Sequence, residues 1–455
     1  MRCLKQATLI LALLGAIVIT GCGGSSDTTS QSNYNNGSGN QPFKPTTHLS
    51  HRSLVSNYYA GDLQVVDATK DLLTSYTFAV GSQPTYMQPS PDGTLTFINN
   101  TGSNTISSFN NNDEAVKGTV SLGGWTESFV TSTDNFVGFA AVYNYSNGTF
   151  RTPGGIARFN PTDGSTNTAI PFPNVRYLGL DTTEQHLLAF TDVDDNAHWV
   201  DLTTIDPNTE VPPYYTLVLS NSSGAPVSLS RPVAAFFSAD NTKAYVLSCG
   251  AECGGSSAST VTEIDTTSIT TPTSLIAGTT YTGTSITAKV INQLAVSGAR
   301  IGLIDLTANK LYVAGSTGTL SDSGGKTVAN GFFTVIDLKA FTASAPIRIT
   351  NGTTDVIRKI NGTFWVASGS GRLGTAPTGC GVQSCITMVN PTTGTATILP
   401  NSNGAATGIA YQTNSGEVYT IEGGQLYIYT QQGQEIISEY TTDIKGQGSD
   451  VIYID

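Results

Sequence analysis

The sequence predicts an all-β protein folded as a β-propeller of eight four-stranded blades, with seven blades as the alternative. Three observations indicate this fold. Residues 81–124 contain one unit of four short strands separated by turns, later segments repeat that unit with variations, and stretches that favour helix are sparse. A unit of four short strands cannot bury both of its faces alone, so such units stack on one another around an axis.

The unit at residues 81–124 serves as the template. Its four strands are expected at Thr85–Met87, Leu95–Ile98, Thr105–Phe109 and Val116–Leu122. The turn Ser90-Pro91-Asp92-Gly93 joins the first two strands, because Pro presets its backbone angle and Asp and Gly tolerate positive φ in tight hairpins.

Matching the rest of the chain to this template gives seven full units. They begin near Pro84, Thr126, Val175, Pro232, Val296, Asp355 and Ala406. The count of blades falls to seven if one unit is divided wrongly, most readily at residues 266–293, where strand boundaries are poorly marked.

The first unit lacks one strand of its own. Only three strands are expected before Pro84, at Leu54–Tyr59, Leu63–Val66 and Tyr76–Val80, and the polar stretch before them cannot supply a fourth. The C-terminal segment Ser449–Asp455 has a strand pattern. We therefore expect the C-terminal strand to become the innermost strand of the first blade and to close the ring, which removes open sheet edges. The domain so defined covers residues 51–455.

Several units resemble the YVTN-type β-propeller repeats of bacterial surface and exported proteins. The match is best at Ser90-Pro91-Asp92-Gly93, followed by Phe97-Ile98-Asn99-Asn100 and Asn104-Thr105-Ile106-Ser107. It is recognisable at Tyr245-Val246 and at Tyr312-Val313. The motif specifies turns and packing, so the resemblance implies the fold and names no function.

Residues 1–21 are predicted to be a lipoprotein signal peptide. Basic Arg2 and Lys5 precede an apolar run at 7–19 that is too short to span a membrane as a mature helix. Ile19-Thr20-Gly21-Cys22 is similar to the lipobox of bacterial lipoproteins, which implies cleavage before Cys22 and lipidation of its sulfur. An ordinary secretory peptide is the alternative. We expect a lipid-anchored protein of the bacterial cell envelope, periplasm-facing or surface-exposed, and Gly23 favours the outer membrane by family precedent.

Residues 22–50 are predicted to form a disordered tether, because they are rich in Ser, Asn, Gly, Thr and Gln and poor in aliphatic residues. Cleavage would remove two basic groups and change the net charge from −12 to −14. Without a cluster of Lys and Arg, nucleic acid is not expected as a partner. We expect a monomer that contacts the membrane through its lipid.

Long connections are expected at one face of the disc. The links between second and third strands are extended at Tyr143–Gly154, Ser248–Thr260, Ala314–Phe332 and Ser368–Cys385. Equivalent connections of a propeller emerge on the same side, so these loops mark a working face, with Arg372 as a candidate residue of its rim. The alternative is that the lengths of these loops vary without any functional role.

Two cysteine pairs lie in those loops, Cys249 with Cys253 and Cys380 with Cys385. In an exported protein such close pairs predict local disulfides that stiffen each loop. A shared four-cysteine zinc site is the alternative, but it needs loops two blades apart to meet. We predict no metal and no cofactor.

Charged residues at the starts of the inner strands are expected to line the mouth of the central channel. They are Glu127, Arg176, Arg231, Asp355 and Asp450. This ring of mixed charge either binds a polar ligand or pairs internally and closes the channel. Asp192–Asn196 begins like a calcium loop but lacks the required Gly and Glu, so it is predicted to be a polar hairpin loop.

No set of catalytic residues can be assembled from the sequence. We therefore predict a non-catalytic binding or scaffold protein that offers its loop-decorated face to an envelope protein or glycan. The alternative is a lactonase-like hydrolase with its site at the channel mouth, because propellers similar to this one include lactonases.

Overall fold

The computed structural model describes residue 47 and residues 49–135, 137–146, 151–160, 162, 165–317, 320–321, 327–328, 330–350, 354–368, 385–402, 405–432 and 435–454. Residues 45–455 form one compact unit, and all that follows concerns that unit. Cys22, Arg372 and Cys380, for which the sequence predicts roles, lie outside the described residues.

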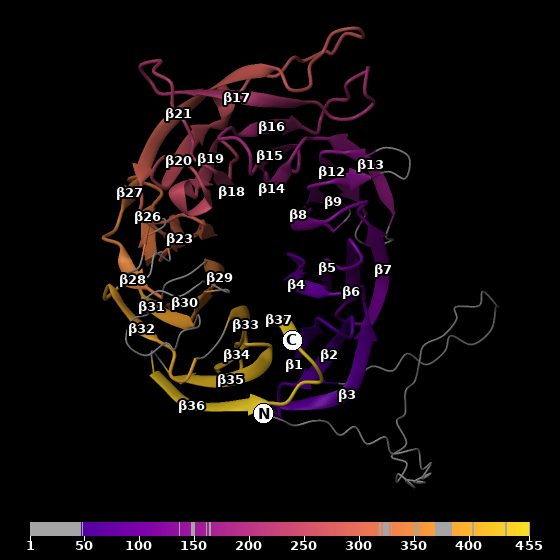
Figure 1. The fold of residues 1–455 in the computed structure, drawn as a ribbon, viewed down its shortest axis with the longest axis vertical. Coiled ribbons are helices and arrows are strands. Elements are labelled where there is room, and N and C mark those ends of the chain that lie inside the picture. Colours follow the sequence, from indigo (N-terminus) through magenta and orange to yellow (C-terminus); the bar gives the residue numbers. More distant parts are fainter. Residues whose placement is uncertain are drawn as a thin grey trace, which may run out of the picture. The chain divides into compact units, whose positions relative to one another are not determined.

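The described strands form seven sheets of four or more strands (Figure 1). Three of these sheets, given from the innermost strand outward, are β37 (Gly448–Ile454), β1 (Arg52–Asn57), β2 (Asp62–Asp67), β3 (Leu72–Ala79); β4 (Pro84–Pro89), β5 (Leu95–Asn100), β6 (Thr105–Asn110), β7 (Ala115–Ser121); and β8 (Thr126–Thr131), β9 (Gly138–Val142), β12 (Gly155–Phe159), β13 (Thr166–Pro171).

Three more sheets complete the second half of the chain. They are β22 (Ile301–Asp305), β23 (Lys310–Ser316), β26 (Gly331–Asp337) with both β27 (Thr342–Ala343) and β28 (Ile347–Ile349); β29 (Thr354–Ile360), β30 (Thr363–Ser368), β31 (Ile386–Asn390), β32 (Thr395–Ile398); and β33 (Ala406–Gln412), β34 (Glu417–Glu422), β35 (Gln425–Gln432), β36 (Glu435–Thr442).

The seventh sheet has eight strands. One half is β14 (Val175–Leu180), β15 (His186–Thr191), β16 (His198–Asp201) and β17 (Tyr214–Ser220), and the other half is β18 (Pro232–Phe237), β19 (Lys243–Ser248), β20 (Thr260–Asp265) and β21 (Ser285–Ala295). The outer strands β17 and β21 pair in parallel, from Thr216 opposite Ser285 to Ser220 opposite Lys289, and so join the halves.

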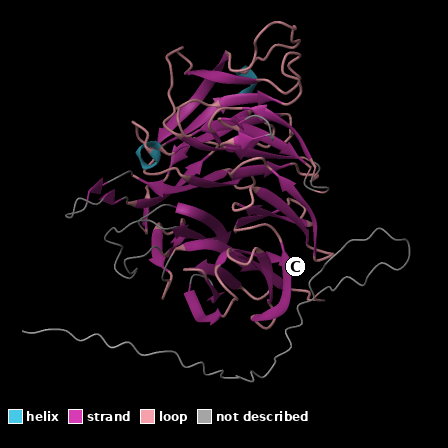
Figure 2. Ribbon diagram, turned by 45° about the vertical axis from the view of Figure 1, so that its right-hand side comes forward, coloured by secondary structure: helices cyan, strands magenta, loops and turns pink. Residues whose placement is uncertain are grey.

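Small elements complete the described chain. They are the ribbons β10 (Tyr145–Ser146) with β11 (Arg151–Thr152) and β24 (Leu320–Ser321) with β25 (Thr327–Val328), and the 3-10 turns η1 (Gly250–Cys253) and η2 (Thr266–Ser268). Among the described residues, then, helix is confined to two single turns, and none is long and apolar enough to cross a membrane (Figure 2).

The all-β propeller class is confirmed, whereas a set of eight separate four-stranded sheets is not. The sheets follow one another around a central axis, and inner strands of neighbouring sheets touch, as β33 touches β37 and β37 touches β4 (Figure 1). Unit starts at Pro84, Thr126, Val175, Pro232 and Ala406 coincide with the inner strands. The start near Val296 is wrong, because β21 runs to Ala295 and the next inner strand begins at Ile301.

The core lies between adjacent sheets. Second strands such as β5, β9 and β30 are buried along their whole length, because a neighbouring sheet covers each of their faces, while the outer strand β3 is mostly exposed. Phe97 of β5 and Phe129 of β8, for example, belong to one cluster and meet edge to face at 6.3 Å.

The predicted pairing of the two ends of the domain is confirmed. β37 runs antiparallel to β1, with Ile452 opposite Leu54 and Val451 opposite Val55. Val451 then packs with Val55, Ile421 and Ile428 in one cluster. The C-terminal strand is therefore the innermost strand of the first sheet, as its apolar pattern predicts.

The predicted turn at Ser90–Gly93 is also present. The hydroxyl of Ser90 donates to Oδ1 of Asp92 at 2.5 Å and accepts from the amide of Leu95 at 3.0 Å, while Gly93 adopts φ 70°. Ser238 and Asp240 repeat the pattern at 2.7 Å, with Asn241 at φ 55°. Local chemistry thus fixes the links between first and second strands.

The alternation of strands defines two faces. The inner strands begin on one face, which we call the entry face. The connections from second to third strands lie on this same face. The turns from first to second strands and from third to fourth strands lie on the other, the exit face. Three of the predicted long loops, at residues 143–154, 248–260 and 314–332, accordingly emerge on the entry face in their described parts, and most of the fourth, 368–385, lies outside the described residues.

Candidate functional site

A cavity of about 220 Å³ opens on the entry face around the starts of the inner strands β14 and β18. We call it the arginine cavity. Its lining residues are Glu127, Arg176, Tyr177, Thr191, Asp192, Arg231, Pro232, Val233, Cys253 and Arg300.

The three arginines reach this cavity from the beginnings of the inner strands of three successive units. Arg176 is the second residue of β14, Arg231 directly precedes β18, and Arg300 directly precedes β22. Because inner strands all begin at the entry face, residues at these places converge on the axis. Three of the predicted channel-mouth residues, Glu127, Arg176 and Arg231, are therefore brought together.

Arg176 is held by carboxylates on both sides. Its Nε donates to Oε2 of Glu127 at 2.6 Å and its Nη1 donates to Oδ2 of Asp192 at 2.9 Å. The guanidinium also lies over the ring of Trp125, 5.1 Å from the centroid. Burial alone would lower the pKa of Arg176, but Glu127 and Asp192 raise it overall. This arginine organises the cavity wall.

Arg231 is fixed through both its backbone and its side chain. Its backbone adopts φ 53°, a left-handed conformation that costs a non-glycine residue about 1 kcal/mol or more. Its amide donates to Oδ1 of Asp195 at 2.8 Å and its Nη1 donates to the carbonyl of Asp192 at 2.5 Å, which hold the strained turn. Its buried Nε finds no hydrogen-bond partner among the described residues, since Asp195 is 4.0 Å away.

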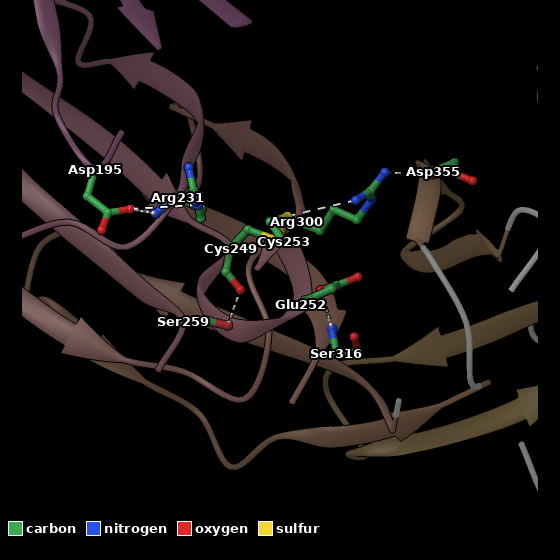
Figure 3. The surroundings of a disulfide bond; sticks show 9 residues. All are labelled: Asp195, Arg231, Cys249, Glu252, Cys253, Ser259, Arg300, Ser316 and Asp355. Atoms are coloured by element: carbon green, nitrogen blue, oxygen red, sulfur yellow. Dashed lines mark hydrogen bonds and ion pairs between the residues drawn. A yellow bond between two sulfur atoms is a disulfide. The ribbon is translucent and has the colours of Figure 1, made fainter. Parts of the chain in front are cut away.

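Arg300 is also only loosely paired. Its Nη2 lies 3.6 Å from Oδ1 of Asp355, and its Nη1 lies 3.8 Å from the sulfur of Cys253 (Figure 3). The distance to Asp355 exceeds the roughly 2.7–2.9 Å of a strong charge-assisted hydrogen bond to oxygen, and the sulfur of the disulfide is only a weak acceptor. Arg300 therefore keeps hydrogen-bonding capacity, whereas the unpaired Nε of Arg231 is buried.

Tyr177 adds a neutral hydroxyl and an aromatic surface to the cavity. Burial raises the pKa of Tyr177, although Arg176 and Arg300 act against that rise. Its phenol therefore stays protonated at neutral pH and can donate a hydrogen bond.

The predicted disulfide between Cys249 and Cys253 is present and forms part of the cavity wall (Figure 3). It closes the 3-10 turn η1, and Ser259 donates to the carbonyl of Cys249 at 2.8 Å. Cys385 is disulfide-bonded as well, while Cys380, its predicted partner, lies outside the described residues.

Replacing both Cys249 and Cys253 with Ser is expected to lower the free energy of unfolding by about 2 kcal/mol, because the disulfide closes only a short loop. The fold should persist. Denaturant unfolding of wild type and variant checks this expectation, and adding a reductant should remove the difference between them. A loss of the folded state in the variant would contradict the local role.

Glu252 stands beside the cavity, next to Cys253. Its Oε2 accepts a hydrogen bond from the amide of Ser316 at 2.7 Å (Figure 3). Burial raises the pKa of Glu252, against the pull of that amide and of Arg300. This contact ties the disulfide loop to β23.

The remaining predicted channel-mouth residues lie elsewhere. Asp355, at the start of β29, faces Arg300 and does not line the cavity. Asp450 is buried within β37, where it accepts hydrogen bonds from the amides of Met87 at 2.7 Å and Val451 at 2.8 Å. It therefore serves the junction between sheets, because no side of its carboxylate opens to the cavity.

The calcium-like segment is a polar connection between β15 and β16. Asp192 pairs with Arg176, Asp194 lies 3.6 Å from His198, and Asp195 accepts from the amide of Arg231. Each carboxylate thus faces a donor of this chain. No group of three or more metal-ligating side chains occurs among the described residues.

Sequence reasoning missed Arg300, Tyr177 and Asp192 as lining residues. Arg300 was concealed by the wrong unit start near Val296. Had that start been placed at Ile301, Arg300 would have matched Arg231, since each directly precedes an inner strand.

The eight-stranded sheet fixes the two main walls of the cavity. Arg176 and Tyr177 come from β14, while Arg231, Pro232 and Val233 lie at the start of β18, and the parallel pairing of β17 with β21 joins these two halves at their outer edge. This link restrains the walls against separating, which favours a preorganised site.

Comparisons with known proteins show the fold. No protein-family model and no curated protein matches the chain. Among solved structures, the dihydro-heme d1 dehydrogenase NirN in complex with DHE is 13% identical, with a TM-score of 0.58 over 90% of this chain and 77% of that one. AztD from Citrobacter koseri is 10% identical, with a TM-score of 0.49 over 89% and 97%.

The periplasmic gluconolactonase PpgL from Pseudomonas aeruginosa is 15% identical, with a TM-score of 0.45 over 89% of this chain and 99% of that one. At such low identity these likenesses carry no activity over to this chain. The likeness to NirN shows the fold alone.

Proposed function

We propose that this protein is an exported, lipid-anchored, non-catalytic binding protein of the bacterial cell envelope, which presents its entry face to a protein or glycan. The observation that carries the proposal is the arginine cavity on that face, which is lined by Arg176, Arg231 and Arg300 and by the neutral phenol of Tyr177. Lipidation at Cys22 supplies the anchor in this proposal.

The position of the N-terminal end of the described domain supports an entry face that a partner can reach. The amide and hydroxyl of Thr47 both donate to the carboxylate of Glu114, which lies in the turn between β6 and β7 on the exit face. Arg52, at the exit-face end of β1, pairs with the same carboxylate at 3.0 Å. A flexible tether that leaves from the exit face keeps the entry face clear of the point of attachment.

The carboxylates of the cavity favour binding over lactone hydrolysis. A general base must be free to approach the water that it activates. Glu127 and Asp192 are both held in ion pairs with Arg176. Donors and acceptors of this kind position a ligand without activating water.

We also propose to count the eight-stranded sheet as two blades, which gives eight in all. Each of its halves has its own inner strand, β14 and β18, and these two strands touch each other as other neighbouring inner strands do.

Site-specific photocrosslinking in cells tests the proposed binding face. A photoreactive residue at Tyr59, which is 76% exposed on the entry face between β1 and β2, is expected to capture a partner. The matched control is Ala239, which is exposed on the exit face between β18 and β19 and should capture none. Equal capture from both positions, or capture from Ala239 alone, would contradict the proposal.

The hydrolase alternative has its own readout. The purified full-length chain should not turn over lactones above the buffer rate. Turnover that disappears in the Glu127→Gln variant would establish the hydrolase and overturn the non-catalytic assignment.

A further inference from the structure

We propose that the arginine cavity binds one neutral pyranose ring, either a free hexose or a hexose residue of a glycan, through hydroxyl groups that donate to Glu127 and accept from Tyr177. This inference rests on the proposed function, because it names the ligand class of the same site. It follows from the compensated charges of the cavity, from the hydrogen-bonding capacity that they leave, and from its size.

The charges around the cavity are compensated within this chain. Each arginine faces at least one carboxylate within 4.0 Å, in the pairs Arg176–Glu127, Arg176–Asp192, Arg231–Asp195 and Arg300–Asp355. An ionic ligand would have to lose its hydration while each guanidinium already has a partner, so its desolvation would cost more than its charge gains. The cavity therefore favours a ligand without net charge.

Tyr177 supplies a hydrogen-bond donor. Its ring packs against two core clusters, which hold the side chain in place. Arg176, Arg300, Glu127 and Asp192 all act electrostatically on its phenol, so the hydroxyl lies among the charged groups of the cavity. It forms no hydrogen bond with any residue that the structure describes. The phenol can therefore donate to a ligand oxygen.

Glu127 supplies a hydrogen-bond acceptor. Nε and Nη2 of Arg176 both approach its Oε2, at 2.6 and 2.5 Å, and thereby fix the carboxylate. Its Oε1 accepts nothing from the described part of the chain, and the side chain is 37% exposed. A hydroxyl group both donates and accepts at one oxygen atom. Two vicinal hydroxyls of a sugar, or one, can therefore serve Glu127 and Tyr177 together.

Arg300 can add a second donor to the same ring. Its Nη2 lies 3.6 Å from Oδ1 of Asp355, longer than the roughly 2.7–2.9 Å of a strong charge-assisted hydrogen bond. A neutral hydroxyl can accept a hydrogen bond from this guanidinium without separating the two charges. This requirement again favours a sugar hydroxyl over an anion.

The size and the apolar lining of the cavity favour one sugar ring. Its volume of about 220 Å³ lies below the roughly 300 Å³ at which pockets begin to hold drug-sized ligands. Pro232, Val233 and the ring of Tyr177 give an apolar surface on which the C–H groups of a pyranose can pack. An extended peptide would instead need a groove or a strand edge for its successive amides. A longer glycan would place one residue inside and extend over the entry face.

Isothermal titration calorimetry of the full-length chain with the methyl α-pyranosides of glucose, galactose and mannose tests this inference. At least one glycoside is expected to bind about 10-fold or more tightly than gluconate, a charged polyol, and N-acetylglycinamide, a neutral amide. Tyr177→Phe should weaken that binding roughly 2- to 10-fold, because it removes one neutral hydrogen bond. Glu127→Gln should weaken it about 10-fold, because a neutral acceptor replaces a charged one.

Tyr76→Phe is the matched control. Tyr76 lies on the outer strand β3 and is 37% exposed, so the same chemical change there should leave glycoside binding unchanged. Thermal unfolding of each variant shows whether a loss of binding reflects a loss of fold.

Three outcomes would overturn the inference: no binding of any of the glycosides, binding of gluconate or N-acetylglycinamide as tight as that of the best glycoside, or equal affinities of the Tyr177 and Tyr76 variants. If Tyr59 still captures a partner while the glycosides fail to bind, the sugar assignment is wrong and the binding function stands. Glycoside binding without any capture would instead uphold the sugar site and overturn the proposal that the entry face binds a partner in cells.

Discussion

Replacing Val451 with Asp should leave little folded protein, because it places a charge where the first and last sheets meet. Val451 is 1% exposed, lies opposite Val55 and packs with Ile421 and Ile428. Losing the buried Val costs roughly 1.5–3 kcal/mol, and burying an unpaired carboxylate adds several more. We expect the free energy of unfolding to fall by about 4 kcal/mol or more, a large part of the usual stability of a domain.

Ile437→Asp is the matched control for this substitution. Ile437 lies on β36, the outermost strand of the sheet that β37 touches, and it is 57% exposed. The same chemical change there should alter the free energy of unfolding by less than about 1 kcal/mol. Denaturant unfolding followed by circular dichroism compares the two variants. If both lose the same stability, the terminal strand does not hold the domain as its packing implies.

The parts of the fold that sequence could predict are those encoded locally or by burial on two faces. The turn at Ser90–Gly93 follows from its own residues, and the second strand β5 is an uninterrupted buried run. β37 could be assigned to the first sheet because that sheet lacked a strand of its own. Each of these features depends on residues that are close together in the sequence or on a count of the strands in each unit.

The parallel pairing of β17 with β21 could not be predicted, because it joins strands that are far apart in the sequence. β21 alternates in burial, with Ala288 and Val290 buried on either side of exposed Lys289, but such a pattern marks a strand without naming its partner, and β17 begins about 70 residues earlier. Pairing between outer strands of two units leaves no local signal. The misplaced start near Val296 follows directly from this, and so does the omission of Arg300 from the site.

The residues of the candidate site also divide into those that the sequence could predict and those that it could not. Glu127, Arg176 and Arg231 could be found because equivalent positions of repeated units converge on the axis. Asp450 occupies such a position too, but Gly408 lies so close that a Cβ there would be 2.5 Å from Oδ1 of Asp450. Equivalence of position therefore predicts proximity to the axis, whereas packing against the next strand decides which side chains reach the cavity.

Asp450 should make the stability of the domain depend on pH. Burial raises its pKa to about 7, although hydrogen bonds from the amides of Met87 and Val451 and the charge of Arg358 oppose that rise. The folded chain thus keeps the proton up to about pH 7, whereas the unfolded chain releases it near pH 4. The stabilisation is fully present below about pH 4 and is lost as the pH rises through about 7, a total of about 4 kcal/mol.

Asp450→Asn removes this titration, because an amide stays neutral at every pH. About 3 kcal/mol of the loss falls between pH 5 and pH 8, so the stability of the variant relative to wild type should rise by that amount over this range. Asp240→Asn is the control, since Ser238 and Thr242 lower the pKa of Asp240 to about 2 and its titration ends below pH 5. Its stability relative to wild type should stay constant from pH 5 to pH 8. Urea unfolding at both pH values measures these differences, and parallel behaviour of the two variants would mean that Asp450 is ionised in the folded chain, with water or a cation reaching the junction between β37 and β4.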